Sequence, residues 1–386
     1  MLINSIKLNN FLSFGETAEP VSLRPLNVVI GPNGSGKSNL LEAIDLLRNA
    51  PHKLTKPVRE GGGVSEWLWK GARDTPIARI DTMIKYSIGS PWLHYVLSFT
   101  SVNRRFEITD EHIEYEKTDN PISNFYYHYD DGTSILNTDR ENEEAFKPTN
   151  LKYDESILSQ LRDPERYKEI TYLAEELNKI KLYREWSFGR RSNVRVPEKA
   201  DLPNDMLETD TSNLGLVLHR LSMEPKTKQR ILDALQLLIC GIDDFGVSIE
   251  SATVQVFLRE GNYTIPATRL SDGTLRYLCL LAILCNPNPP PLVCIEEPEL
   301  GLHPDILPTL AELMKEASTR CQLIVTTHSD ILVDTMTEQP ESVLICEKGE
   351  TGTELRRLSA EELKPWLEKY RLGELWISGQ LGGTRW

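Results

Sequence analysis

The sequence predicts an α/β protein in which helices cover a mixed sheet, joined by an antiparallel β subdomain and a helical insertion. Three observations support this fold class. An apolar run at residues 26–30 passes through a glycine-rich loop into a helical pattern at 38–47. Residues 77–138 show the alternating and aromatic patterning of antiparallel strands. The last third of the chain alternates helical and strand patterns, which is typical of a parallel, helix-covered sheet.

The first half of the chain changes pattern several times. Residues 52–75 are rich in Gly and Trp and are expected to be irregular, and the polar residues 139–150 are expected to form a loop. Residues 154–186 are expected to be helical with one interruption, at Asp163-Pro164. Residues 187–212 contain Gly, Pro, Asn and Asp and are expected to form an exposed connection.

The second half of the chain is expected to contain shorter helices and strands. Residues 214–240 are expected to be helical with a break at Pro225, followed by a hairpin of 247–258 and 263–267. Helices are then expected at 275–284, 306–317 and 361–371, and strands at 292–295, 323–326 and 342–346. The apolar residues 375–377 near the C-terminus are expected to pack on the protein. The chain is accordingly divided into an N-terminal lobe (1–150), a mainly helical insertion (151–245), a C-terminal lobe (246–350), and a C-terminal helix with its tail (351–386).

Composition excludes several classes of protein. The 386 residues are 40% hydrophobic and carry a net charge of −14, so the chain is neither disordered nor coated in nucleic acid, although a local basic patch is compatible with this charge. We see no membrane-length apolar run and no signal peptide. None of the six cysteines forms a C-x-x-C pair, which predicts reduced thiols in a cytoplasmic protein and no zinc site.

Residues 31–38, Gly-Pro-Asn-Gly-Ser-Gly-Lys-Ser, match the phosphate-binding pattern G-x-x-x-x-G-K-[ST] between a strand and a helix. Glycines let backbone N–H groups curl around a phosphate, and the helix adds its positive N-terminal end. We therefore expect ATP and Mg²⁺ as cofactors. Lys37 is expected to reach the β- and γ-phosphates, and the Ser38 hydroxyl to bind Mg²⁺. The predicted nucleotide-binding residues of this loop are Asn33, Gly34, Ser35, Gly36, Lys37 and Ser38.

A second motif ends the apolar strand at 292–295 with two carboxylates, Glu296 and Glu297. In P-loop enzymes the first such carboxylate supports the Mg²⁺ ion, and the next polarises the attacking water. Glu296 stands where Asp is usual, so its longer side chain is expected to contact Mg²⁺ through water rather than directly. Glu297 is the predicted catalytic base.

The residues Leu270-Ser271-Asp272-Gly273-Thr274, which open an apolar helix, resemble the L-S-G-G-Q signature of ABC-type ATPases. The resemblance implies that Ser271 and Gly273 contact the γ-phosphate held by the P-loop of a second subunit. It also implies that His328, in Thr326-Thr327-His328-Ser329, contacts the γ-phosphate and helps position the water. Asp272 and Thr274 depart from the signature, and His303 stands where the family's D-loop has Asp.

The chain resembles the RecF/SMC branch of that family and is therefore expected to have an ABC-ATPase head. Lys37 and Ser271 are 234 positions apart, so an insertion splits the head. The opening Asn10-Phe11-Leu12-Ser13-Phe14 is similar to that of this branch, and the E-E-P-E-x-x-L-H-P and T-T-H-S segments are like those of predicted AAA-type ATPases close to the OLD family. The resemblance covers residues 1–50 and 265–350. After His328 no D-x-D pair follows, so we expect no TOPRIM nuclease in this chain.

Two functions follow from the resemblance. In the first, a homodimer or higher even oligomer closes around ATP-Mg²⁺ and couples hydrolysis to DNA repair or anti-phage defence, with a separate effector such as a nuclease. Seven Lys and Arg residues within 179–199, interleaved with Trp186 and Phe188, are then a candidate DNA contact. In the second, the protein is an ATP-gated assembly scaffold that binds a protein partner without contacting DNA, and this basic stretch is a solvated loop. Neither function involves a membrane.

Overall fold

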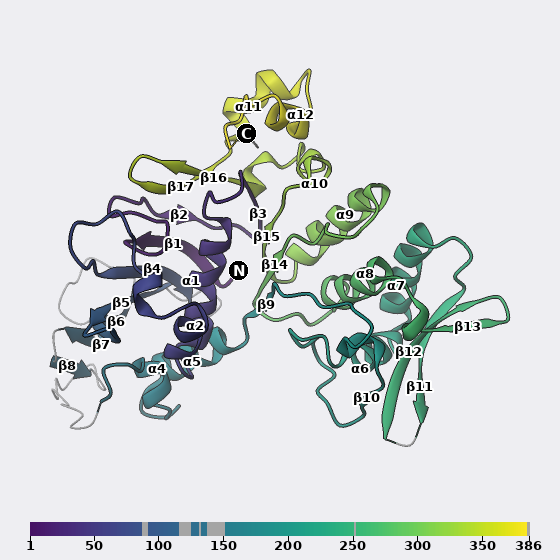
Figure 1. Cartoon of the computed structure of the whole chain (residues 1–386), viewed down its shortest axis with the longest axis horizontal. Coiled ribbons are helices and arrows are strands. Elements are labelled where there is room, and N and C mark those ends of the chain that lie inside the picture. Colours follow the sequence, from purple (N-terminus) through teal and green to yellow (C-terminus); the bar gives the residue numbers. More distant parts are fainter. Residues whose placement is uncertain (87–91, 116–124, 131–132, 137–150, 251, 384–386) are drawn as a thin grey trace. The chain divides into compact units, whose positions relative to one another are not determined.

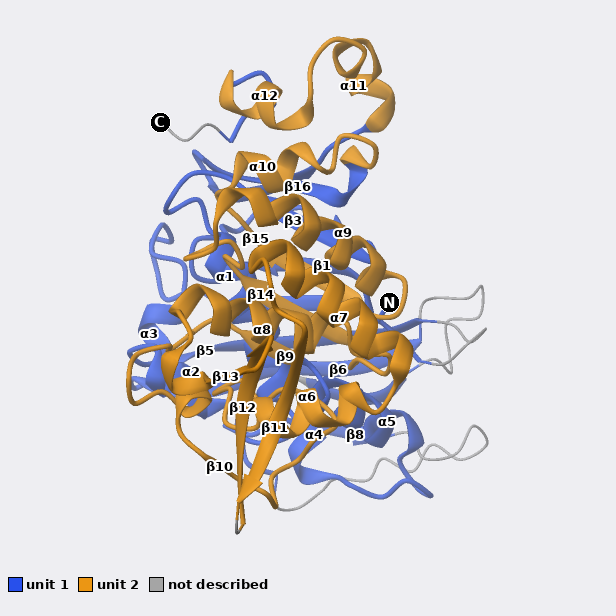
Figure 2. Cartoon of the chain, turned by 90° about the vertical axis from the view of Figure 1, so that its right-hand side faces the viewer, with its two compact units in different colours: residues 1–180, 341–359, 379–386 blue, residues 181–340, 360–378 orange. Residues whose placement is uncertain are grey.

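The computed structural model describes residues 1–86, 92–115, 125–130, 133–136, 151–250 and 252–383 (Figure 1). The chain forms two compact units, coloured separately in Figure 2. Unit 1 consists of residues 1–180, 341–359 and 379–386, and unit 2 of residues 181–340 and 360–378. Of the helices in the described parts of the chain, none has both the length and the apolar character needed to cross a membrane.

A seven-stranded sheet with antiparallel neighbours throughout makes up much of unit 1. Its strands, in spatial order, are β2 (Val21–Ser22), β1 (Ile3–Asn9), β4 (Ala78–Lys85), β5 (Trp92–Val102), β6 (Arg105–Tyr115), β7 (Phe125–Asp130) and β8 (Thr133–Leu136). Residues along β4 alternate between buried and half-buried, so one face of the sheet is apolar and the other polar. The predicted antiparallel meander is confirmed for the described residues between 77 and 138. The loop predicted at 139–150 lies outside them.

The strand, loop and helix predicted around the glycine-rich motif are confirmed in unit 1. β3 (Leu26–Ile30) is fully buried and pairs in parallel with β16 (Val343–Gly349), whose other neighbour is the antiparallel β17 (Gly352–Arg357). The helices of unit 1 are α1 (Lys37–Asn49), α2 (Thr55–Glu60), α3 (Val64–Trp67), α4 (Ile157–Gln160) and α5 (Lys168–Asn178). The short helices α2 and α3 occupy the stretch that we expected to be irregular.

Unit 2 contains a parallel group of strands, with β14 (Leu292–Glu296) between β9 (Lys181–Tyr183) and β15 (Gln322–Thr326). A separate antiparallel sheet has the order β10 (Glu198–Lys199), β12 (Thr253–Glu260), β11 (Asp244–Glu250), with β13 (Tyr263–Pro266) also on β12. The helices are α6 (Leu214–Ser222), α7 (Pro225–Leu238), α8 (Asp272–Leu284), α9 (Leu307–Ser318), α10 (Asp330–Asp334), α11 (Ala360–Leu367) and α12 (Leu372–Ile377). The predicted break at Pro225 and the parallel pairing in the last third are confirmed.

Three boundaries differ from the prediction. Residues 181–183 form β9 rather than the end of a helix, because the apolar pair Leu182 and Tyr183 aligns with β14. Residues 247–258 belong to two strands, β11 and β12, which pair with each other in antiparallel register. The C-terminal helix ends at Leu367, and α12 follows it.

The connection at 187–212, predicted to be exposed, is partly buried. Val194, Arg195, Met206 and Leu207 are all less than 9% exposed. Its apolar residues follow no regular period, so patterning could not show that they are buried. Leu375 and Trp376 are buried and α12 packs on α10, as predicted for the apolar tail. Ile377, which was also predicted to pack, is 54% exposed.

A buried carboxylate in the meander predicts a pH-dependent stability. Glu111 accepts hydrogen bonds from the hydroxyls of Tyr95 and Ser156 and from the N–H of Ile157. Desolvation outweighs these bonds and raises the pKa of Glu111 from 4.5 to about 7. Because the folded protein then binds this proton more tightly than the unfolded chain, the free energy of unfolding falls as pH rises from about 4.5 to about 7. The expected loss is about 3 kcal/mol.

Urea unfolding at about pH 5 and about pH 8 measures this slope. We expect Glu111→Gln to reduce this slope, because glutamine does not titrate in this range. Part of the slope should remain, because burial also raises the pKa of Glu198 to about 7. Glu107 is a half-buried residue on the same strand, β6, and Glu107→Gln is the matched control. This substitution should leave the pH dependence of stability unchanged. A Glu111→Gln variant with an unchanged slope would contradict the assignment.

Candidate functional site

The loop between β3 and α1 has the conformation of a phosphate-binding loop. Gly36 precedes α1 with a φ of 114°, and a Cβ there would lie 2.5 Å from Thr353 Oγ1, so a side chain at this position would be both strained and obstructed. Gly34 also has a positive φ, of 76°. The 13-residue helix α1 starts directly after this loop, and its N-terminal N–H groups provide a site for an anion.

Two side chains of the loop fit a phosphate ligand. Lys37 is 6% exposed, and its Nζ donates to the carbonyl oxygens of Gly31 at 2.8 Å and Pro32 at 3.0 Å. Ser35 Oγ is buried and has no hydrogen-bond partner among the described residues. A buried ammonium group and an unpaired hydroxyl are groups that a bound phosphate could satisfy. Ser38 is exposed on the first turn of α1, as a hydroxyl that binds Mg²⁺ must be.

Residues that the sequence did not predict hold this loop in place. Ser13 Oγ accepts a hydrogen bond from Asn39 Nδ2 at 2.6 Å and lies 2.7 Å from Thr353 Oγ1. Thr353 Oγ1 is also 2.7 Å from the carbonyl oxygen of Ser35. The backbone N–H of Thr353 donates to the carbonyl oxygen of Ser13. The Asn-Phe-Leu-Ser-Phe opening thus supports the phosphate loop through Ser13, while Phe11 packs against Trp67.

In unit 2 the predicted catalytic residues lie together at the ends of adjacent strands. Glu297 follows β14, His328 follows β15, and Glu297 Oε1 is 3.4 Å from His328 Nε2. Glu297 has a φ of 47°, which is uncommon for a residue other than glycine, and its N–H donates to the carbonyl of Thr326. Both side chains remain about one-third exposed, so water can reach them.

Glu299 is a further carboxylate of this cluster whose role the sequence did not reveal. Its Oε1 accepts hydrogen bonds from Thr327 Oγ1 and from the N–H of His328, both at 2.7 Å. Burial raises the pKa of Glu299 above its usual value, against these hydrogen bonds. Glu299 therefore fixes the backbone that carries His328. The repeated carboxylate in Glu-Glu-Pro-Glu was the only sequence signal for it.

Glu296, the predicted Mg²⁺ residue, is in an ion pair in this structure. Arg184 Nε donates to Glu296 Oε2 at 2.9 Å, and both side chains are largely buried. The structure thus joins Glu296 to a member of the basic stretch that the sequence assigned to DNA.

The predicted signature residues begin α8 as expected. Ser271 caps the helix, and its Oγ accepts a hydrogen bond from the N–H of Thr274 at 3.1 Å. A Cβ on Gly273 would lie 2.6 Å from the carbonyl oxygen of Gly301, so this glycine allows the helix to approach the 299–302 loop closely. The two predicted residues therefore lie at a helix N-terminus that suits an anion.

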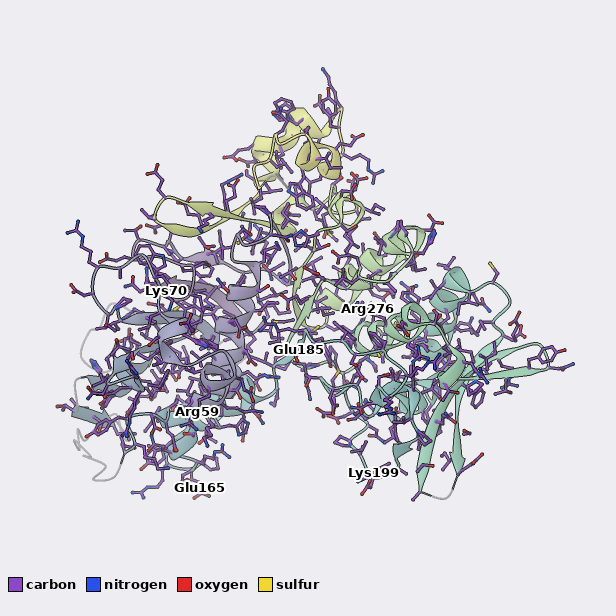
Figure 3. All side chains as sticks on the ribbon, in the orientation of Figure 1. Arg59, Lys70, Glu165, Glu185, Lys199 and Arg276 are labelled. Carbon is purple, nitrogen blue, oxygen red and sulfur yellow. The ribbon has the colours of Figure 1, made fainter. Side chains whose placement is uncertain are left out.

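The central part of the predicted DNA-binding stretch has a structural role instead. Arg195 is 8% exposed and donates to the backbone carbonyls of Phe188, Ala267 and Leu270 and to the Asp272 carboxylate. Trp186 and Phe188 stack on each other, and the guanidinium carbon of Arg276 on α8 lies 5.2 Å from the centre of the Trp186 ring. Arg276 is labelled in Figure 3. DNA contact was one of two interpretations left open for this stretch, and the burial of Arg195 removes Arg195 from it. Charge patterning does not distinguish a buried Arg from a solvated one.

This arrangement predicts that Arg195 matters for folding. Arg195→Met should lower the free energy of unfolding by about 3 kcal/mol or more, because it leaves the partners of a buried guanidinium unsatisfied. Chemical denaturation measures this change. Arg190→Met is the matched control, since Arg190 is exposed, and it should cost less than about 0.5 kcal/mol. Equal effects of the two substitutions would refute the structural role.

Solved Smc heads share this fold. One is the Smc head bound to the C-winged helix domain of ScpA, and another is the Smc head with an extended coiled coil bound to the C-terminal domain of ScpA derived from Pyrococcus furiosus. Each matches with a TM-score of 0.58 and 14% identity, over 94% and 96% of this chain respectively and 99% of the solved chain. The fold and the motifs define an ABC-type P-loop ATPase with an SMC-like head.

The family model described as "AAA domain, putative AbiEii toxin, Type IV TA system" matches residues 26–334. The chain belongs to this family, and it is an ATPase. The retron Ec83 probable ATPase of Escherichia coli is 23% identical over 392 residues, 87% of this chain and 70% of that protein. The chromosome partition protein Smc of Cereibacter sphaeroides is 36% identical over 78 residues, which cover 20% of this chain and 6% of that protein.

Proposed function

We propose that the chain binds ATP with Mg²⁺ at residues 33–38 and hydrolyses it with Glu297 and His328. The observation that carries this proposal is the 3.4 Å separation of Glu297 Oε1 and His328 Nε2. In this proposal, Lys37 binds the terminal phosphates, while Ser38 and Glu296 hold Mg²⁺, which neutralises phosphate charge. Glu297 accepts the proton of the attacking water, and His328 orients that water.

The second part of the proposal is a dimer that ATP closes. Ser271 and Gly273 of one subunit bind the γ-phosphate held by the other, in a homodimer or a higher even oligomer. The anion-binding character of the α8 N-terminus supports this assignment. Hydrolysis removes the bridging phosphate and opens the dimer.

The third part concerns the pathway. We propose that the ATPase works in the cytoplasm in anti-phage defence or DNA repair with a separate effector, such as a nuclease. The retron relative supports the defence assignment. Direct DNA contact, if it occurs through residues 179–199, uses the exposed Arg190, Arg191 and Lys199 rather than Arg195.

An alternative function is an ATP-gated scaffold for a protein partner that does not contact DNA. The burial of Arg195 and the stacking of Trp186, Phe188 and Arg276 favour this alternative, because they occupy the groups best suited to bind a nucleic acid.

Light-scattering mass of the Glu297→Gln variant, with and without ATP-Mg²⁺, tests the proposed dimer. A doubled mass only with ATP supports it. An unchanged mass means either that the subunits are already assembled through another surface or that Ser271 does not bind the γ-phosphate of the second subunit. ATP turnover of the protein with its native Glu297, measured with and without duplex DNA and again with Arg190, Arg191 and Lys199 replaced by Gln, separates the two functions. DNA-stimulated turnover that these substitutions reduce supports direct DNA contact, and a flat response supports the scaffold.

A further inference from the structure

The polar face of the meander carries three of the seven histidines of the chain: His94 on β5, His112 on β6 and His128 on β7. Neighbouring ring centres, from His94 to His112 and from His112 to His128, are 5.5 Å apart. We propose that His94, His112 and Glu114 bind a divalent transition-metal ion of the Zn²⁺ type. None of these residues belongs to the nucleotide motifs.

Strand register brings the three ligands together. His94 pairs directly with Glu114 across β5 and β6, and His112 lies two positions before Glu114 on the same face. One ligand atom from each residue lies within 4.8 Å of the others. Zinc–ligand bonds of about 2.0–2.2 Å place the ligands of a tetrahedral site about 3.4 Å apart, so small side-chain rotations suffice to enclose an ion.

Carboxylates bind the outer nitrogens of both histidines. His94 Nε2 is 2.8 Å from Asp81 Oδ1, and His112 Nδ1 is 3.1 Å from Asp110 Oδ1. Such a carboxylate fixes the tautomer of a metal-binding histidine and increases its basicity. The arrangement leaves His94 Nδ1 and His112 Nε2 as ligand atoms. His94 Nδ1 now lies 2.8 Å from Glu114 Oε1, and an ion would replace the proton between them.

Charge and exposure also suit a cation. The acidic residues Asp81, Asp110 and Glu114 outnumber the basic residues beside them, Arg79 and Lys7, so the cluster carries an excess of negative charge when its histidines are neutral. The side chains of His94, His112 and Glu114 are 16–27% exposed, which permits ion entry and leaves a fourth position for water. Asp110, His112 and His128 form an overlapping group, but Arg79 lies 3.2 Å from Asp110 Oδ2 and disfavours a second cation there.

Calorimetric titration of Zn²⁺ into the tag-free, chelator-treated full chain, without nucleotide, tests the site. We expect one ion per chain with micromolar or tighter affinity, and a tetrahedral absorption spectrum with Co²⁺. His94→Gln and His112→Gln should each weaken binding at least tenfold. Asp81→Asn changes only the carboxylate that bonds to His94 Nε2, and it should weaken Zn²⁺ binding by about 10- to 100-fold. His52→Gln is the matched control and should bind Zn²⁺ like the wild type, because His52 is exposed and bonds only to Asn178 among the described residues.

Two results would overturn the proposal. One is the absence of stoichiometric binding by the wild type. The other is binding that His94→Gln and His112→Gln leave unchanged, which would locate the ion elsewhere, and His328→Gln then tests the Glu297–His328 pair as that location. Circular dichroism establishes that each variant is folded, and the Co²⁺ spectrum of the wild type reports the ligands without any substitution.

Discussion

Replacing Glu297 with Gln is expected to lower the rate of ATP turnover by about 10²- to 10⁴-fold while ATP binding stays close to that of the wild type. Glutamine keeps the shape of the side chain beside His328 but cannot accept a proton from water. It also keeps the backbone conformation, because the positive φ of Glu297 is equally uncommon for both residues. Phosphate release and equilibrium nucleotide binding measure the two quantities separately.

Glu312→Gln is the matched control for this change. Glu312 lies on α9 of the same unit, with its side chain 62% exposed in an ion pair with Lys315. Such surface pairs contribute little, so its turnover should equal that of the wild type. A Glu297→Gln variant that retains more than about a tenth of the wild-type turnover would remove Glu297 as the base.

Replacing Lys37 with Ala is expected to weaken ATP binding by at least about 10²-fold. Two charge-assisted hydrogen bonds to phosphates are together worth about 3 kcal/mol or more. Fluorescence titration with a labelled ATP analogue and Mg²⁺ measures the loss. The same substitution removes the hydrogen bonds of Nζ to Gly31 and Pro32, so thermal unfolding without nucleotide is needed to separate a local fold defect from lost affinity.

Lys53→Ala serves as the control, because Lys53 is an exposed lysine of the same unit, beyond α1. It should bind ATP as the wild type does. If Lys37→Ala bound ATP as tightly as the wild type, residues 33–38 would not be the nucleotide site.

The sequence predicted the motifs that are continuous along the chain. The loop at 31–38, the carboxylates after β14, the cap at Ser271 and the histidine after β15 each lie within a few residues of a buried strand or an apolar helix. Local patterning identifies such elements, and the order of strands then indicates which strand ends meet. This reasoning predicts that Glu297 and His328, which follow adjacent strands, lie close together, and the structure places them in contact.

The features that the sequence did not predict depend on contacts between residues that are far apart in the sequence. Cross-strand register places His94 beside Glu114, and nothing in either segment alone indicates a partner. Arg195 resembled a solvated cation because its carbonyl partners at 188, 267 and 270 are backbone groups that any residue could provide. Residues 181–183 were assigned to a helix because three residues are too few to reveal a period, and β14 determines their conformation.

The contact of Ser13 and Thr353 beside Ser35 also has a consequence for how the protein is made. These residues are 340 positions apart, and all of 181–340 is synthesised between the two parts of unit 1. On the ribosome, unit 2 can begin to fold while the phosphate loop still lacks β16 and β17. The nascent chain should therefore complete the support of its phosphate loop only after Thr353 has left the exit tunnel.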